Sequence, residues 1–316
     1  MPRIVTLTLN PTIDKSTTAD QIVADHKIRC AAPKFEPGGG GLNVSRALRR
    51  LGSDSVAVFP VGGPSGQLLR QLLSEEHIEQ RPVAIEGWTR ENFIVVDGAT
   101  GQQYRFGMPG PTLRPEEQQQ VLQVLREFSE RPEFLVVSGS LPPGVEPELL
   151  TRIARAAHEL GVKVVADTSG PALAALLATG VYLAKPNVGE LSKMQGVEEL
   201  DSQAVAGAAQ QLVQAGKCEI VVVSMGPQGA CVVSAEGVDY VAAPSVKKRS
   251  TVGAGDSMVA GLVHGLSEGR SLRETARLGV ACGTAATMNP GTELFRPADV
   301  DRLYQWLLQT MPAAAV

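Results

Sequence analysis

Helix and strand patterns alternate regularly through the second half of the chain. Four segments with helical spacing each precede a short apolar strand pattern. These pairs lie at 115–128 and 134–138, 147–160 and 162–167, 171–178 and 182–184, and 203–215 and 220–224. Such alternation predicts a mainly parallel sheet covered by helices on both faces, a three-layer α/β/α fold. Ligands of these folds bind beyond the carboxyl ends of the strands, so the loops there are expected to form the site.

Two inserts interrupt this order in the first half of the chain, at about 12–36 and 88–108. The first contains a weak strand pattern at 27–31. The second contains a hairpin pattern in which 93–96 and 103–106 flank a turn. We expect the inserts to pair into a small β-sheet that covers the site as a lid, on a single domain formed by all 316 residues.

Four basic residues lie in these inserts: Lys27, Arg29, Arg90 and Arg105. If they face one cleft, their charge would suit a phosphate group. Basic side chains on edge strands also protect sheets from aggregation, and the inserts could be two surface hairpins. The concentration of charge favours the lid.

Composition excludes several classes of protein. The formal net charge is −4 and the isoelectric point is near 5.7, which argues against a nucleic-acid or membrane-surface partner. The four cysteines and four histidines are scattered, so a zinc site is not expected. The N-terminal residues have strand patterning and no apolar run reaches transmembrane length, so we expect a cytoplasmic protein with buried free thiols.

The segment Ser250–Met258 combines small residues with an acid directly before an apolar, helix-like run. Main-chain amides of Gly253, Ala254 and Gly255 could hold an anion at a helix start, and Asp256 could act there as a general base. Alternatively, Asp256 is only the N-cap of the helix. A dinucleotide fingerprint is a poor match because the third glycine is missing and the segment lies late in the chain.

Further polar groups follow other predicted strands. Asn187 and Glu190 are three residues apart after the strand at 182–184, a spacing that suits either Mg²⁺ beside a nucleotide or a capping box. The turns Ser138–Gly144 and Ser224–Ala230 could contact a sugar and a nucleotide, or could be ordinary turns. Asp14 and Asn43 supply acceptors and donors suited to sugar hydroxyls.

Two segments together resemble the signatures of the ribokinase-type sugar kinases. They are Gly38–Val44, which reads GGGGLNV, and Thr251–Asp256, which reads TVGAGD. The resemblance covers essentially the whole chain, and Asn187–Glu190 is similar to the NxxE motif of the family. Within the family, the chain is most similar to the second-isozyme type of 6-phosphofructokinase. Related kinases of fructose 1-phosphate and tagatose 6-phosphate usually carry a lysine where this chain has Gly40.

The resemblance implies a ribokinase-like fold and an ATP- and Mg²⁺-dependent transfer of phosphate to the 1-hydroxyl of fructose 6-phosphate by a homodimer joined through the lid. Asp256 would be the base, and Gly253, Ala254 and Gly255 the anion hole. The implied sugar-phosphate ligands are Asp14, Lys27, Gly38, Gly39, Gly40, Asn43, Arg90, Arg105, Ser138 (or Ser140) and Gly139. Those implied for ATP are Lys185, Asn187, Ser224, Gly226, Gly229 and Thr251. Glu190 would act on Mg²⁺ through water. A monovalent cation, K⁺, would lie at Ser250, Val252, Ala286, Asn289 and Gly291.

Three alternatives stay open at this point. The chain could be a 1-phosphofructokinase or a tagatose-6-phosphate kinase, or it could be a sugar-phosphate-binding regulator without turnover. The base and the intact glycine turn argue against a regulator. Glu293 stands where close relatives are expected to have a basic residue, which puts the cation site in question.

Overall fold

The computed structural model describes residues 4–128 and 131–310. Its main sheet has nine strands in the order β13-β12-β11-β10-β9-β8-β1-β4-β5. All neighbouring strands are parallel except at the β13 end, where β11 pairs with β12 and β12 pairs with β13 in antiparallel fashion. The strands are β1 (Ile4–Leu7), β4 (Ser55–Val61), β5 (Glu79–Ala84), β8 (Phe134–Ser138), β9 (Lys163–Asp167), β10 (Val181–Ala184), β11 (Cys218–Ser224), β12 (Ala230–Ser234) and β13 (Gly237–Val241). The predicted mainly parallel sheet is confirmed.

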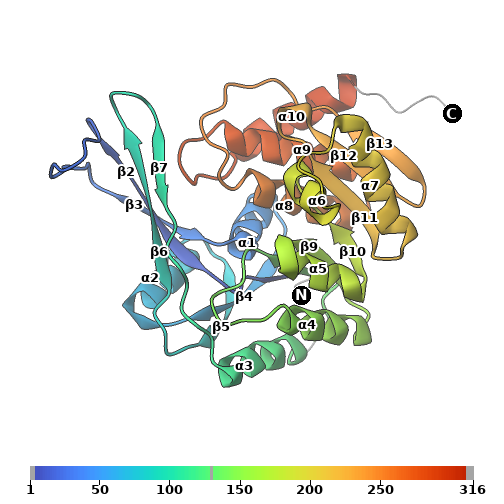
Figure 1. Ribbon diagram of the computed structural model, residues 1–316, viewed down its shortest axis with the longest axis horizontal. Coiled ribbons are helices and arrows are strands. Elements are labelled where there is room, and N and C mark those ends of the chain that lie inside the picture. The colour runs from blue at the N-terminus through green and yellow to red at the C-terminus, as the bar shows by residue number, and fades with distance from the viewer. Residues whose placement is uncertain (1–3, 129–130, 311–316) are drawn as a thin grey trace.

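Helices cover both faces of this sheet (Figure 1). One face carries α1 (Gly40–Arg50), α2 (Gly63–Glu75), α8 (Ala254–Ser267), α9 (Leu272–Thr287) and α10 (Pro297–Thr310). The other carries α3 (Pro115–Arg126), α4 (Glu148–Glu159), α5 (Gly170–Thr179), α6 (Val188–Met194) and α7 (Ser202–Gln214). Alternate strand residues enter opposite cores, as in β8, where Val136 belongs to the core that includes residues of α1, α8 and α9, and Val137 belongs to the core that includes residues of α3 and α4. The result is the expected three-layer arrangement.

A second sheet of four strands stands at one side of the body (Figure 1). Its order is β3-β2-β6-β7, with β2 (Thr12–Ala19), β3 (Lys34–Gly38), β6 (Arg90–Asp97) and β7 (Gln103–Phe106). The hairpin of the second insert is confirmed as β6 and β7. The strand predicted at 27–31 is wrong: within that segment Cys30 makes only an isolated bridge to Ala19, and β3 begins at Lys34.

Two differences from the predicted elements have simple causes. β5 was not anticipated, because its burial pattern is mostly exposed or half-exposed, as suits the last strand of the main sheet. β2 was expected only as part of an insert, because its polar side chains hide the strand pattern. Among the described residues, no helix is long and apolar enough to cross a membrane.

Candidate active site at the carboxyl edge of the sheet

Four neighbouring strands deliver polar residues to one edge of the main sheet. β8 ends at Ser138, β9 ends at Asp167, Lys185 follows β10, and β11 ends at Ser224. These strands are adjacent in the order β8-β9-β10-β11. Parallel strands present their carboxyl ends at the same edge, so the fold itself gathers these groups.

Helix α8 begins opposite this edge, and its start holds the candidate base. Gly253 is the N-cap and has a φ of 72°, a left-handed conformation that glycine adopts without strain. Asp256 lies in the first turn but makes no cap hydrogen bond. Its Oδ2 instead accepts from Asn43 Nδ2 at 2.9 Å. The alternative that Asp256 is merely an N-cap is therefore wrong.

The surroundings of Asp256 tune its acidity. Burial and the nearby carboxylate of Asp167 raise the pKa of Asp256 to about 7, while the Asn43 hydrogen bond and the Lys185 ammonium lower it. Asp14 adds a further negative charge that raises this pKa. A carboxylate with a pKa near neutrality is well matched to accept a proton from a hydroxyl group.

Lys185 and Asp167 form a buried ion pair beside this base. Their Nζ and Oδ1 atoms are 3.0 Å apart, and the Lys185 side chain is only 5% exposed. Ser138 Oγ donates to Asp167 Oδ2 at 3.4 Å. The sequence reasoning missed Asp167, although its position at the end of a predicted strand was a usable signal. Asp167 thus brings the predicted site residues Lys185 and Ser138 together.

The glycine loop that opens α1 lies directly against two other parts of the site. A Cβ atom on Gly38 would collide with the Asp14 carboxylate, and one on Gly40 would collide with Ser138 Oγ and the Gly139 amide. Gly39 has a φ of 110°. Only glycines permit this close approach, so Gly38–Gly40 bring Asp14, Asn43 and the Ser138–Gly139 turn around one space next to Asp256.

Asp14 and Arg90 form the lid side of this space. Asp14 lies on β2, is 8% exposed and accepts from Asn92 Nδ2 at 3.0 Å. Burial raises the pKa of Asp14, and the Arg90 charge lowers it. The Arg90 guanidinium donates to the carbonyls of Asn10 at 2.9 Å and Met108 at 3.0 Å. Its Nε atom is buried and has no hydrogen-bond partner within the described part of the chain.

The other two predicted phosphate ligands do not join Arg90 within this chain. Lys27 is exposed in the loop between β2 and β3. Arg105 is exposed on β7, where its guanidinium donates to Gln103 of the same strand. Arg105 pairs in register with Ile94, and β6 alternates so that Ile94 shares a sheet face with Asn92 and Arg90. Arg105 thus shares the site-facing side of the lid, whereas Arg29 is exposed in the same loop as Lys27.

A pocket of about 450 Å³ lies on the other side of the α8 start. Asn187, Ser224, Gly226, Gly229 and Thr251, all predicted for the nucleotide, line it together with Ala254 and Gly255 of the glycine turn. The sequence reasoning missed the apolar walls, which come from Ala243, Pro244, Val246, Met258 and Val280. Nothing in the local pattern of these residues distinguishes a pocket wall from core.

Asn187 and Glu190 form a complete capping box at the start of α6. Asn187 Oδ1 accepts from the Glu190 amide, and a Glu190 carboxylate oxygen accepts from the Asn187 amide, each at 2.8 Å. Burial and the Asp167 charge raise the pKa of Glu190, and Lys185 lowers it. The cap and a role at the nucleotide are compatible, because one carboxylate oxygen suffices for the cap. The described residues contain no group of three or more His, Cys, Asp or Glu side chains that could hold a metal ion.

The residues predicted for a monovalent cation gather beside the glycine turn. Ser250 Oγ donates to the Gly291 carbonyl at 2.7 Å and accepts from the Val252 amide at 3.2 Å. Asn289 is buried and its amide donates to the carbonyls of Ala285 and Leu294. The Ala286 carbonyl accepts from the main-chain N–H of Asn289 at 3.2 Å. The side chain of Glu293 turns away to the lid, where it accepts from Lys34 Nζ at 2.8 Å.

Residues 7–299 match the pattern of pfkB family carbohydrate kinases. The chain is 47% identical over 308 residues to the ATP-dependent 6-phosphofructokinase isozyme 2 of Escherichia coli, which covers 97% of this chain and 99% of that protein. It is 34% identical over 294 residues to the 1-phosphofructokinase of Bacillus subtilis, and the alignment covers 92% of this chain and 95% of that protein.

Solved structures of related kinases superpose on this chain. Phosphofructokinase-2 from Escherichia coli in complex with potassium superposes with a TM-score of 0.93 and 47% identity over 97% of this chain and 99% of that one. A tetrameric inhibited form of the same protein superposes with a TM-score of 0.91 and 45% identity over the same shares. Arabidopsis thaliana ribokinase, complexed with ribose and ATP, has a TM-score of 0.76 at 18% identity over 96% of this chain and 99% of that one.

Proposed function

The chain belongs to the pfkB family of carbohydrate kinases, and we propose that it phosphorylates fructose 6-phosphate at the 1-hydroxyl group, with ATP as the phosphoryl donor. Its fold is ribokinase-like. The identity of 47% to a 6-phosphofructokinase, against 34% to a 1-phosphofructokinase, favours fructose 6-phosphate over the related substrates. The observation that carries the chemistry is the Asp256 carboxylate, which lies between the Asp14–Asn43 space and the 450 Å³ pocket and has a pKa of about 7.

Asp256 is the general base of this reaction. It accepts the proton of the sugar 1-hydroxyl as that oxygen forms its bond to the γ-phosphorus of ATP. The bond between this phosphorus and the β,γ-bridging oxygen breaks, and ADP leaves with the electron pair. The amides of Gly253, Ala254 and Gly255 lie at the start of a 14-residue helix, where they stabilise the charge on the transferred group.

The sugar lies in the space bounded by Asp14, Gly38–Gly40, Asn43 and the Ser138–Gly139 turn. Carboxylate and amide groups pair with its hydroxyls. The Arg90 guanidinium, which the carbonyls of Asn10 and Met108 hold in place, supplies positive charge to the 6-phosphate. Arg105 adds a second charge from the same face of the lid. Lys27 reaches the phosphate of the partner subunit in a dimer.

The nucleotide occupies the 450 Å³ pocket, with its phosphates towards the glycine turn. Lys185 contributes positive charge there, since a Cβ atom on Gly255 would lie 3.5 Å from its Nζ atom. Mg²⁺, when bound, would neutralise charge on the phosphates. Glu190 and Asp167 are the carboxylates that would hold it, through water. Carbonyl oxygens of Ser250, Val252, Ala286, Asn289 and Gly291 would hold K⁺, a proposal supported by the potassium complex of the Escherichia coli protein. Glu293 does not obstruct this, because it pairs with Lys34.

The proposed activity is tested by the products. Purified protein with Mg-ATP and fructose 6-phosphate should form ADP and fructose 1,6-bisphosphate in equal amounts, measured by coupled assay and by NMR of the sugar. Binding of the sugar phosphate without any release of ADP would instead identify a regulator. We place the reaction in the cytoplasm, in keeping with the three buried free thiols.

A homodimer through the lid is supported by the outer face of the second sheet. Phe35, Phe93, Tyr104 and Phe106 are 37–51% exposed there, on the face opposite Asp14 and Asn92. Lys15 lies 5.3 Å from the ring centroids of both Phe35 and Phe93. A contiguous exposed aromatic patch is typical of an interaction site. A second copy of the same sheet would bury it symmetrically and bring Lys27 towards the partner's site.

Phe93→Glu should separate this dimer. Burying a phenylalanine side chain contributes about 1.5–3 kcal/mol to the free energy of association. In a twofold-symmetric dimer the substitution occurs once in each subunit, so its effect is doubled. The dimer dissociation constant should therefore rise by about 10²–10⁴-fold. Sedimentation velocity of the 33.3 kDa chain measures it, with the exposed Trp306→Glu on α10 as the matched control. A Phe93→Glu protein that sediments as wild type places the interface elsewhere.

A further inference from the structure

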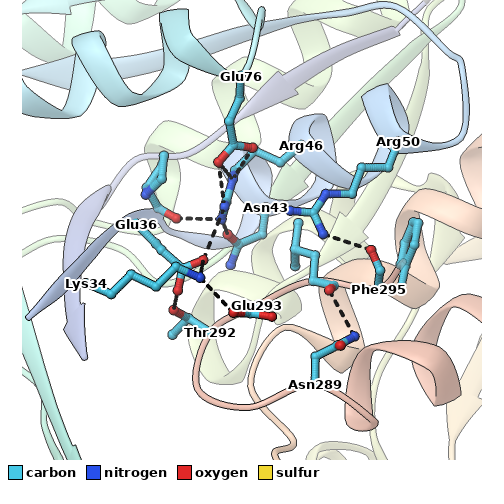
Figure 2. A network of polar contacts seen from close by, with 12 residues as sticks. Lys34, Glu36, Asn43, Arg46, Arg50, Glu76, Asn289, Thr292, Glu293 and Phe295 are labelled. Carbon is cyan, nitrogen blue, oxygen red and sulfur yellow. Dashed lines mark hydrogen bonds and ion pairs between the residues drawn. The ribbon is translucent and has the colours of Figure 1, made fainter. Parts of the chain in front are cut away.

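Arg46 is a fully buried arginine that the proposed chemistry has not yet used. It lies on α1, three residues after Asn43, and its side chain is 1% exposed. Figure 2 shows its guanidinium at the centre of a polar network between α1, α2 and the lid strand β3. A buried charge is costly unless it is well paired, so this residue must make specific contacts.

Two elements outside α1 immobilise the guanidinium. Its Nε and Nη2 atoms donate to the carboxylate of Glu76, directly after α2, at 2.7–2.9 Å. Its Nη1 atom donates to the Pro37 carbonyl of β3 at 2.8 Å. Glu36 lies 3.8 Å from Nη2 and is itself fixed by Thr292. The position of Nη1 is therefore set by the fold and not by the substrate.

The same Nη1 atom donates to Asn43 Oδ1 at 3.2 Å. Arginine has only donors, so the oxygen of the Asn43 amide must face Arg46. The NH₂ end must then face the other way, where it donates to Asp256 Oδ2 at 2.9 Å. If this amide were reversed, its oxygen would face the carboxylate of Asp256 and repel it.

We propose that Arg46 is a positioning residue for phosphoryl transfer, which holds the Asn43 amide in the orientation that donates a hydrogen bond to Asp256. The inference rests on the proposed role of Asp256 as the base. The groups that face Asp256 are Asn43 on α1, Asp167 after β9, Lys185 after β10 and Asp14 on β2. Arg46 hydrogen-bonds only to the first of these. Its charge also lowers the pKa of Asp14, and Arg46→Lys keeps that charge, so the lysine variant should change one contact at the base and leave the other three in place.

The test is the pH dependence of kcat in an Arg46→Lys variant. The lysine ammonium should pair with the Glu76 carboxylate, the stronger partner, and leave the Asn43 oxygen without its donor. One hydrogen bond to a charged group corresponds to about 1–2 pKa units, so the acidic limb of kcat should move up by about 1–2 pH units. Arg50→Lys is the matched control, because Arg50 lies one turn later on α1 and donates to the Phe295 carbonyl.

A second variant guards against misfolding. Arg46→Met combined with Glu76→Met replaces the ion pair by apolar side chains of similar volume, a change that proteins often tolerate. It should show the same shift of the acidic limb, and adding Asn43→Ala to either variant should shift the limb no further. Unmoved limbs in both folded variants would overturn the positioning role while the activity itself stands. An inactive wild-type protein would overturn the proposed function instead.

Discussion

Asp256→Asn is expected to lower kcat by about 10²–10⁴-fold while binding of fructose 6-phosphate stays within a few-fold of wild type. The amide keeps the shape of the side chain and its contact with Asn43, but it cannot accept the hydroxyl proton. The loss should therefore fall on kcat and not on sugar affinity, which isothermal titration calorimetry measures without turnover. Asp299→Asn, in the first turn of α10, is the matched control.

The same residue predicts the pH profile. A base must be deprotonated to act, and the pKa of Asp256 is raised to about 7 by burial and by Asp167. Wild-type kcat should therefore fall as the pH drops through about 7, and the residual activity of Asp256→Asn should lack this limb. A variant that retains most of the turnover and the same limb would show that another group is the base.

Arg90→Ala should raise the KM for fructose 6-phosphate by about 10–150-fold, since a hydrogen bond to a charged group contributes about 1.5–3 kcal/mol. The guanidinium is held by two carbonyls at the base of the lid. Because Arg90 is proposed to contact the 6-phosphate and not the reacting hydroxyl, kcat should change little.

Unphosphorylated fructose is the comparison substrate for this experiment. If Arg90 binds the phosphate, Arg90→Ala should weaken fructose 6-phosphate but leave the weak turnover of fructose nearly unchanged. Arg152→Ala, an exposed arginine on α4, controls for the loss of surface charge. An equal loss of kcat/KM on both substrates would mean that Arg90 stabilises the lid and does not bind the phosphate.

The sequence predicted the elements whose patterns are local. The alternation of helices and strands after residue 115 needs only apolar periodicity, and β8 to β11 appear within a few residues of their predicted bounds. The lid strand β3 was misplaced because lysine and proline within Lys34–Gly38 obscure its pattern. The hairpin of β6 and β7 was easier to find, since a glycine-containing turn marks it.

Residues of the candidate site could be proposed from the sequence where they belong to a short motif. Asp256 and the glycines at 38–40 and 253–255 stand in two short signatures, and the structure brings both to one space. Asp167 pairs with Lys185, and Arg46 pairs with Glu76. The partners are distant in sequence, so no local sequence pattern predicts these ion pairs. Lys27 remains a prediction because its proposed place is in a second copy of the chain.

The account's central claim is the choice of substrate, and one measurement tests it most directly. Purified protein with Mg-ATP should be assayed for kcat/KM on fructose 6-phosphate, fructose 1-phosphate, tagatose 6-phosphate and ribose. We expect the highest value on fructose 6-phosphate and the lowest on ribose, which lacks the phosphate group proposed to contact Arg90. A higher kcat/KM on any of the other three sugars would contradict the account.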